Sequence, residues 1–307
     1  GLVDFVLRVI SGRNERAANM PQAIADAAAE MRRNGIMAVG DISNTTDTVA
    51  EKRLGHLYFY NFVEVLGWVP SGAEAAYARA KEVLESFAGC GPATLVPHAS
   101  YTVSDPLWAM LGAHFAGHTI SVHNQETPDE DLFIRDGKGA FVELYQKLKV
   151  DNAHHVPKDV SSLRSYFDKL DSAARRLLVH NTFIPEEDLA YALDNSAANT
   201  TFFCLCINAN LYIESKVPPV ELLRSKKAPI VIGTDSLASN WQLGIHEEIR
   251  SLRKHFPSVP LEEMLGWATL NGAKALQMDA ELGSFEQGKK PGVVLLQEDD
   301  WTVRRII

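Results

Sequence analysis

The residues with the clearest chemical potential are histidines and acids that follow apolar segments of strand length. His98, His123 and His180 each end such a segment, Asp235 ends another in PIVIGTD, and Glu126 follows soon after His123 in SVHNQE. A hydrolytic zinc or iron site needs neutral imidazoles and a carboxylate that converge on one ion, with an open position for water. The set therefore predicts a metal-dependent hydrolase.

Each of these residues also has a simpler structural interpretation. A single histidine at a strand end more often forms a structural hydrogen bond than binds a metal, and Glu126 alone could simply begin a helix. The ordered set is what favours a metal site. Glu126 then suits a general acid and base, because a carboxylate just beyond a metal-binding histidine can take a proton from water and deliver it to a leaving nitrogen. His154 and His155, in LKVDNAHHVPKDVSS, are expected to face solvent from an inserted loop.

The elements that must position these residues are parallel strands, because apolar runs alternate along the chain with longer segments of helical period. The helix PQAIADAAAEMRRNG is typical, with Pro21 in its first turn and Gly35 at its exit. Further helices are expected to start near Gly72, Asp105, Pro185 and Val220. The expected strands are IMAVGDI from Ile36, LYFYNFVEV from Leu57, ATLVPH from Ala93, HTISVH from His118, RLLVH from Arg176, TTFFCLC from Thr200 and PIVIGTD from Pro229.

This alternation predicts an α/β fold, a TIM-type (β/α)8 barrel whose active site lies where the carboxyl ends of the strands meet. A closed barrel of this type has eight strands, and the chain supplies seven, so the first strand is expected to precede Gly1. The barrel domain is expected over residues 1–278, incomplete at its N-terminus. Residues 279–307 contain VVLL and WTVRRII, which predict two short β-strands outside the barrel.

Composition limits the classes of partner. A chain of 307 residues that is 46% hydrophobic and 22% charged is an ordinary globular protein. Its net charge of -9 disfavours nucleic acid and anionic membranes, which are normally met by clustered Lys and Arg, and its apolar runs are too short to cross a bilayer. A small molecule is the expected partner. Cys90, Cys204 and Cys206 are too few for a disulfide scaffold, which favours a cytoplasmic location.

Five strings in this order, VPHASYTVS, SVHNQETPDEDLF, LVHNT, CINANLYIE and IGTDSLASN, resemble the amidohydrolase superfamily. The resemblance covers about Pro97 to Gly292 and is to the branch with chlorohydrolase-like proteins and the guanine, S-adenosylhomocysteine and aminodeoxyfutalosine deaminases. It implies a (β/α)8 barrel with a small β-sandwich built from both termini. It also implies one catalytic zinc or iron and the hydrolytic removal of an amino group or halide from a nitrogen heterocycle.

The resemblance also implies individual roles. His123 and Asp235 correspond to metal ligands, and Asp235 is positioned to help deprotonate water. Glu126 corresponds to the residue that carries the proton. His180 corresponds to a histidine that contacts the attacking water or the substrate, so we place it with both the metal-binding and the catalytic residues.

The substrate side of the resembling site involves His98, which would face the substrate together with Glu126. Asn208 and Asn210 match a loop near the pocket, and we expect Asn208 to bind substrate, with a turn-stabilising amide as the alternative. In the resembling proteins the first strand ends in a His-x-His pair that donates two metal ligands, and this chain contains no such pair.

The leading hypothesis is a metal-dependent deaminase of an aminated purine or similar heterocycle, closest to the aminodeoxyfutalosine deaminases of a menaquinone route. A chlorohydrolase and a guanine deaminase are the alternatives within this class. If Gly1 is near the natural start, a metal-free pseudoenzyme that binds a heterocycle or a partner protein is the alternative from another class. Without the His-x-His pair, the chain is expected to be catalytically impaired, and a homodimer is expected from the resemblance.

Overall fold

Parallel strands alternate with helices through most of the protein, and every strand expected from the sequence is present. The structure is a computed structural model that describes residues 1–12 and 19–307. The parallel strands are β1 (Ala38–Ser43), β2 (Tyr58–Val65), β3 (Ala93–Pro97), β4 (Thr119–Asn124), β5 (Arg175–His180), β6 (Thr201–Leu205) and β7 (Ile230–Ile232).

These strands form two parallel sheets, with the orders β1-β2-β3 and β4-β5-β6-β7. A parallel bridge between Ala99 and His123 joins the two sheets just beyond β3, so the strands follow one another in chain order, as in the wall of a barrel. Asn124 of β4 pairs with His180 of β5, which brings the carboxyl ends of these strands to one level. Among the described strands, β1 and β7 each pair with a single neighbour.

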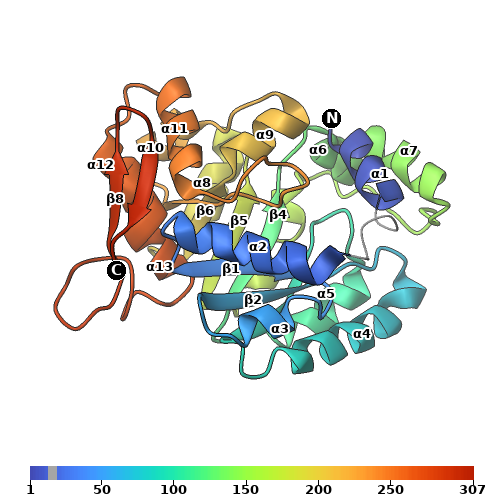
Figure 1. The fold of residues 1–307 in the computed structure, drawn as a ribbon. Helices are drawn as coiled ribbons and strands as arrows, with labels where there is room; N and C mark the ends of the chain where they lie inside the picture. The colour runs from blue at the N-terminus through green and yellow to red at the C-terminus, as the bar shows by residue number, and fades with distance from the viewer. Residues whose placement is uncertain (13–18) are drawn as a thin grey trace.

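Helices surround the strands (Figure 1). Helices α4 and α5 pack on β2 and β3, and α1 lies against α7 and α9. The α-helices are α1 (Leu2–Gly12), α2 (Met20–Arg33), α3 (Val49–Lys52), α4 (Ala73–Ser86), α5 (Asp105–Gly112), α6 (Asp129–Asp136), α7 (Ala140–Leu148), α8 (Glu186–Asp194), α9 (Ile207–Glu214), α10 (Val220–Ser225), α11 (Ile245–His255), α12 (Leu261–Gly266) and α13 (Gly272–Ala275). Shorter turns are η3 (Pro70–Gly72), η4 (Leu163–Ser165), η5 (Phe167–Leu170) and the π-helical η6 (Trp267–Asn271).

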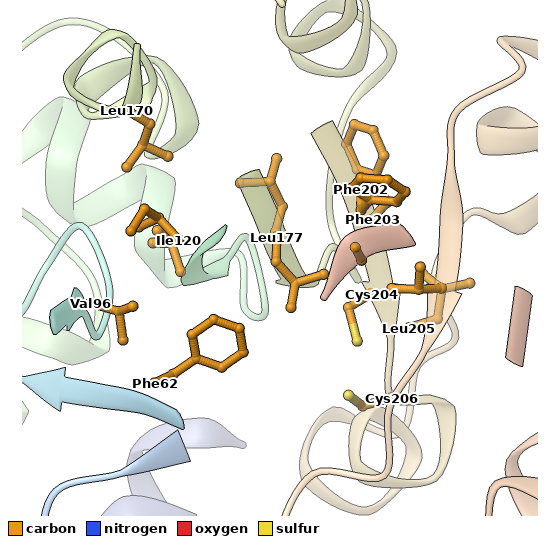
Figure 2. Close-up of a cluster of buried hydrophobic side chains, with 14 of the residues drawn as sticks. Phe62, Val96, Ile120, Leu170, Leu177, Phe202, Phe203, Cys204, Leu205 and Cys206 are labelled. Carbon is orange, nitrogen blue, oxygen red and sulfur yellow. The ribbon is translucent and has the colours of Figure 1, made fainter. Parts of the chain in front are cut away.

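The main hydrophobic cluster lies among the strands and includes side chains from β2, β3 and β4. Phe62, Val96 and Ile120, from three successive strands, are fully buried in it (Figure 2). Side chains two residues apart in a strand share a face. Glu64 therefore continues the face of β2 that carries Phe62, and His98 continues the face of β3 that carries Val96.

The two ends of the chain lie outside the series of parallel strands. At the N-terminus, helix α1 begins at Leu2, which is buried. At the other end, β8 (Val294–Gln297) and β9 (Thr302–Arg305) confirm the two predicted short strands and pair with each other in antiparallel fashion. The domain division at residue 278 stays a prediction.

The segment between α7 and η4 is a loop, as expected, but its histidines do not face solvent. Both His154 and His155 are half-buried and pack against Trp68, with ring centroids 5.0 and 5.3 Å away. His155 also stacks on Phe133, and its Nε2 atom lies 2.8 Å from the carbonyl oxygen of that residue. The expectation was wrong because the charged residues and the proline of this segment are typical of an exposed loop and do not indicate that its histidines pack against Trp68.

Helices long and apolar enough to span a lipid bilayer do not occur in residues 1–12 or 19–307.

Candidate active site

Three imidazole rings stand in a row where β3, β4 and β5 end. The ring centroids of His98 and His123 are 4.6 Å apart, and those of His123 and His180 are 5.4 Å apart. The planes of each pair are tilted by less than 30°. The structure therefore brings together the three histidines that the sequence singled out.

Each of these rings is anchored through its Nδ1 atom to an oxygen. The Nδ1 atom of His98 lies 2.9 Å from the hydroxyl of Thr102, and that of His180 lies 2.9 Å from Oδ1 of Asn210. The Nδ1 atom of His123 lies 3.0 Å from the backbone carbonyl of His98. Carbonyl oxygens can only accept, so Nδ1 of His123 and of His180 carries the proton, and Nε2 is left with a free lone pair. Such anchoring is how proteins prepare histidines to bind a metal.

The electrostatic surroundings keep two of the rings neutral. Burial, followed by the nearby charges of His123 and His180, lowers the pKa of His98 well below its usual range. Burial also lowers the pKa of His180, although Asp235 and the hydrogen bond with Asn210 act in the opposite direction. Neutral imidazoles are the form that binds a metal.

Glu64 is a site residue that the sequence analysis missed. It lies in β2 and is partly buried, with Oε1 3.7 Å from Nδ1 of His123. Burial raises its pKa, as does the charge of Asp235, while His123 and a hydrogen bond with Asn44 lower it. The only signal in the sequence is an acid inside an otherwise apolar strand, NFVEV, which is costly unless the carboxyl group has a partner.

Among the described residues, Glu64, His98 and His123 place one potential ligand atom each within 4.8 Å of one another. This cluster shares only His123 with the predicted metal set of His123, His180 and Asp235. The structure therefore joins His123 to a carboxylate on the preceding sheet as well as to His180.

Glu126 lies directly beside the row of imidazoles. Its side chain is buried, and Oε1 is 3.7 Å from Nε2 of His180. Burial is the main cause that raises its pKa to about 8, helped by the charges of Asp235 and Glu214 and opposed by that of His123. A carboxyl group with a pKa near neutrality can both accept and donate a proton in working conditions.

Asp235 lies just beyond β7 with a positive φ of 55°. Its carboxylate accepts hydrogen bonds of 2.6 Å from the backbone N–H of Ser236 and from the hydroxyl of Ser239. Its charge influences Glu64, Glu126 and His180. Asp235 thus belongs to the same electrostatic unit as the histidines, while its oxygens bind its own turn.

Positive φ values are concentrated along this edge of the strands. His180 has a φ of 76°, Asn181 one of 55° and Gln125 one of 43°. Residues with side chains are rarely found in this region, and they persist there when the surroundings hold them. The amide of Asn124 bonds Asn181 at 3.0 Å, so the ends of β4 and β5 hold each other in this arrangement.

Asn208, predicted to bind substrate, is placed differently. It lies in helix α9, not in a loop, and is completely buried. Its Nδ2 atom donates to Glu248 at 2.8 Å, and its Oδ1 accepts from the hydroxyl of Ser251 at 2.6 Å. Both ends of the amide therefore bond side chains of α11, and the substrate role of Asn208 stays a prediction. The amide nearest the imidazoles is that of Asn210.

The comparisons with known proteins identify the family of the chain. The chain belongs to the amidohydrolase family, because residues 11–304 match the sequence model of that family. It is 28% identical over 286 residues to the aminodeoxyfutalosine deaminase of Deinococcus radiodurans, covering 87% of this chain and 66% of that protein. It is 39% identical over 213 residues to the 5-methylthioadenosine/S-adenosylhomocysteine deaminase of Thermoanaerobacter pseudethanolicus, covering 66% of this chain and 44% of that protein. The chain thus spans less than two thirds of each relative.

Solved structures confirm the expected fold class. Helicobacter pylori aminofutalosine deaminase, in complex with methylthio-coformycin, superposes with a TM-score of 0.78 at 25% identity, covering 92% of this chain and 70% of that one. An atrazine chlorohydrolase from Arthrobacter aurescens, complexed with zinc and atraton, gives a TM-score of 0.74 at 14% identity, covering 97% and 69%, and shows the fold alone. An adenosine deaminase from Xanthomonas campestris with bound zinc gives 0.66 at 22%, covering 89% and 60%.

Proposed function

We propose that this chain forms most of the active site of a metal-dependent hydrolase that deaminates an aminated purine nucleoside. The observation that carries the proposal is the row of His98, His123 and His180, with the buried Glu126 beside it. The deaminase relatives support the reaction class, and the similarity to aminodeoxyfutalosine deaminases supports that substrate as the first candidate. On that substrate the enzyme would serve a menaquinone route.

The donor atoms fit one divalent ion of the zinc or iron type. Imidazole nitrogens and carboxylate oxygens are ligands that both metals accept. His123 is common to every set we consider, with His180 and Asp235 from the sequence and Glu64 and His98 from the geometry. When bound, such a metal polarises water so that it attacks carbon at neutral pH.

The chemistry assigned to the protein itself is proton transfer. Hydrolytic deamination replaces the C–NH2 group of the purine by C=O, consuming one water and releasing one ammonia. Glu126 accepts a proton from the attacking water and delivers it to a nitrogen of the substrate, which its raised pKa allows in both directions. His180, whose Nε2 faces Glu126, orients the water, and His98 faces the purine.

The test uses the whole protein that contains this chain, loaded with zinc or with iron. Aminodeoxyfutalosine, S-adenosylhomocysteine and guanine are assayed for ammonia release, and a chlorinated triazine is assayed for chloride release. Ammonia from either nucleoside supports the proposal. Release from guanine or the triazine alone would replace it with the corresponding alternative. Silence on all substrates, with one ion bound per chain, would contradict a deaminase of this class.

Metal content separates the enzyme from the pseudoenzyme. About one ion per chain in the whole protein is expected, whereas none would favour a binding module. The remaining expectations, a cytoplasmic location and a homodimer, are part of the same proposal. The first is supported by three buried free cysteines, and analytical ultracentrifugation tests the second.

A further inference from the structure

Glu130 holds the backbone on which Glu126 stands. It lies in the first turn of α6 and is completely buried. Its Oε1 accepts the backbone N–H of Glu126 at 2.7 Å, and its Oε2 accepts the N–H of Gln125 at 3.0 Å. The hydroxyl of Ser162 donates to Oε2 at 2.9 Å. One carboxylate therefore binds two successive amides of the turn that follows β4.

This turn needs such a partner. Gln125 has a φ of 43°, a conformation that is unfavourable for a residue with a side chain and survives only when its surroundings determine it. A buried N–H without an acceptor destabilises a protein by about 1–3 kcal/mol. Because Glu130 accepts a hydrogen bond from both N–H groups, neither of them is left unpaired. The same two bonds fix the direction in which the side chain of Glu126 extends from the backbone.

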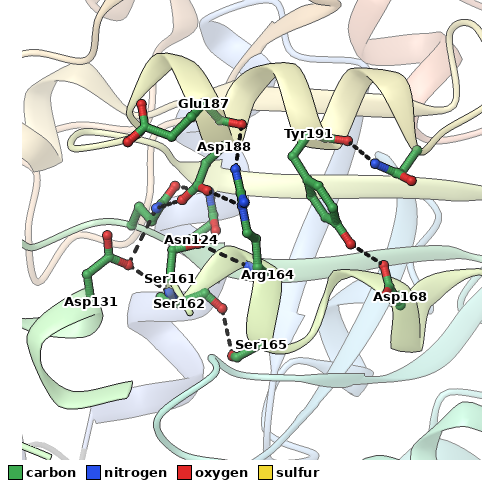
Figure 3. Close-up of polar contacts among 12 residues, drawn as sticks. Asn124, Asp131, Ser161, Ser162, Arg164, Ser165, Asp168, Glu187, Asp188 and Tyr191 are labelled. Carbon is green, nitrogen blue, oxygen red and sulfur yellow. Dashed lines mark hydrogen bonds and ion pairs between the residues drawn. The ribbon is translucent and has the colours of Figure 1, made fainter. Parts of the chain in front are cut away.

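The side chain of Gln125 has a separate anchor. Its Nε2 atom donates to Asp188 of α8 at 2.6 Å, and Asp188 also accepts from Nε of Arg164 at 2.8 Å. Figure 3 shows this network, in which Arg164 reaches Asp188 of α8 from the segment that also contains Ser161 and Ser162. Asp188 thus holds the Gln125 side chain, whereas Glu130 accepts hydrogen bonds from the backbone N–H groups of Gln125 and Glu126.

We propose that Glu130 is a positioning residue for Glu126. The proposal rests on the proposed function, because it assumes that Glu126 moves protons. The hydrogen bonds of Glu130 in the described part of the chain go to the Gln125–Glu126 backbone and to Ser162, so it acts on the site through that backbone. A displacement of Glu126 of the order of 1 Å is enough to slow a proton transfer by about 100-fold, while the groups that bind metal and purine stay in place.

The test replaces one oxygen of this carboxylate. In Glu130→Gln the new amide NH2 faces a backbone N–H, so one of the two hydrogen bonds is replaced by a clash of donors. We expect kcat to fall about 10–100-fold, with KM and metal content within about twofold of the wild type. Asn61→Ala is the matched control. It removes a buried amide in the middle of β2 that bonds the backbone carbonyls of Cys90 and Pro92, just before β3, so it should lower stability and leave kcat unchanged.

A double variant distinguishes positioning from a general loss of structure. If Glu130 acts through Glu126, then Glu130→Gln has little further effect on the residual rate of Glu126→Gln. Effects that multiply, or a KM that rises while kcat is constant, would overturn the proposal.

The backbone can also be followed without turnover. Hydrogen exchange at the amides of residues 125 and 126 should accelerate at least tenfold in Glu130→Gln relative to Asn61→Ala. If the wild type deaminates nothing, the proposed function fails and this exchange measurement still decides whether Glu130 holds the turn. Unchanged exchange at these two amides would overturn the proposal by itself.

Discussion

The Nε2 atom of His180 lies 3.7 Å from Oε1 of Glu126, with both side chains buried. The opposite ring nitrogen of His180 is held by Asn210. The hydrogen bond with Asn210 therefore orients the His180 ring so that its Nε2 lone pair faces the carboxyl group of Glu126.

Glu126→Gln should abolish most turnover without disturbing the site. The amide keeps the size of the carboxyl group but cannot carry the proton, so kcat is expected to fall by roughly 10²- to 10⁴-fold. Ammonia release measures the rate, and metal analysis of the same sample is the control. A variant that retains a tenth or more of the wild-type rate would exclude Glu126 as the proton carrier.

His123→Ala should remove the metal. This ring belongs both to the predicted ligand set and to the Glu64–His98–His123 cluster, so its loss is expected to lower metal content well below one ion per chain. Elemental analysis after dialysis measures this. His114→Ala is the control, because His114 bonds Tyr77 away from the site. Equal metal contents in the two variants would remove His123 from the ligands.

Asn210→Ala should lower both activity and metal affinity, because Asn210 holds the ring of His180. Loss of the Oδ1 acceptor frees the imidazole to change tautomer and rotate, and outer partners of this kind typically contribute about 10- to 100-fold in activity or metal affinity. The readout is kcat together with metal affinity. Asn208→Ala is a useful comparison, because Asn208 bonds α11 and not an imidazole; a larger loss of kcat in Asn208→Ala than in Asn210→Ala would contradict our assignment.

Glu248 should make the stability of the metal-free protein depend on pH. Burial raises its pKa to about 7, although Asn208 and Asn240 donate to it. Because the folded-state pKa lies above the unfolded value of about 4.3, the protonated group stabilises the fold fully below that value. This contribution is lost as the pH rises toward 7, at roughly 1 kcal/mol for each pH unit.

Urea unfolding between about pH 5 and 7 tests this prediction. Glu248→Gln should show a free energy of unfolding that varies less with pH than that of the wild type. The same pH dependence in both proteins would show that Glu248 is not the group responsible.

Gly233 should not tolerate a side chain. A Cβ atom there would lie 2.9 Å from Sγ of Cys204 and 3.2 Å from Sγ of Cys206. Gly233→Ala is therefore expected to lower the free energy of unfolding by about 1–3 kcal/mol, and Cys204→Ala in the same chain should recover part of this. Gly266→Ala in α12 is the control, because a Cβ atom added at Gly266 would have no other atom within 4 Å. This substitution should stabilise the helix by up to about 1 kcal/mol. Equal stabilities would contradict this close packing.

Much of the fold and part of the site followed from the sequence. Apolar runs that end in His98, His123 and His180 mark both the strands and their polar ends, because in a parallel barrel these two features coincide. Glu64 was missed because an acidic residue inside an apolar segment does not reveal from the sequence alone whether it faces a site or whether the segment is not a strand. The substrate role of Asn208 stays a prediction, and the string CINANLYIE does not reveal that Asn208 lies in a helix with its amide bonded to Glu248.

The contact between the two parallel sheets has a consequence for how the protein loses function. Where β3 meets β4, the main chain is joined by the bridge between Ala99 and His123 and by the N–H of His123, which donates to the carbonyl of His98 at 2.9 Å. The same carbonyl orients the His123 ring. A local separation of the sheets at this seam would release the ring before either sheet unfolds. We expect activity to disappear at lower urea concentrations than the loss of helical circular dichroism, so that inactivation precedes global unfolding.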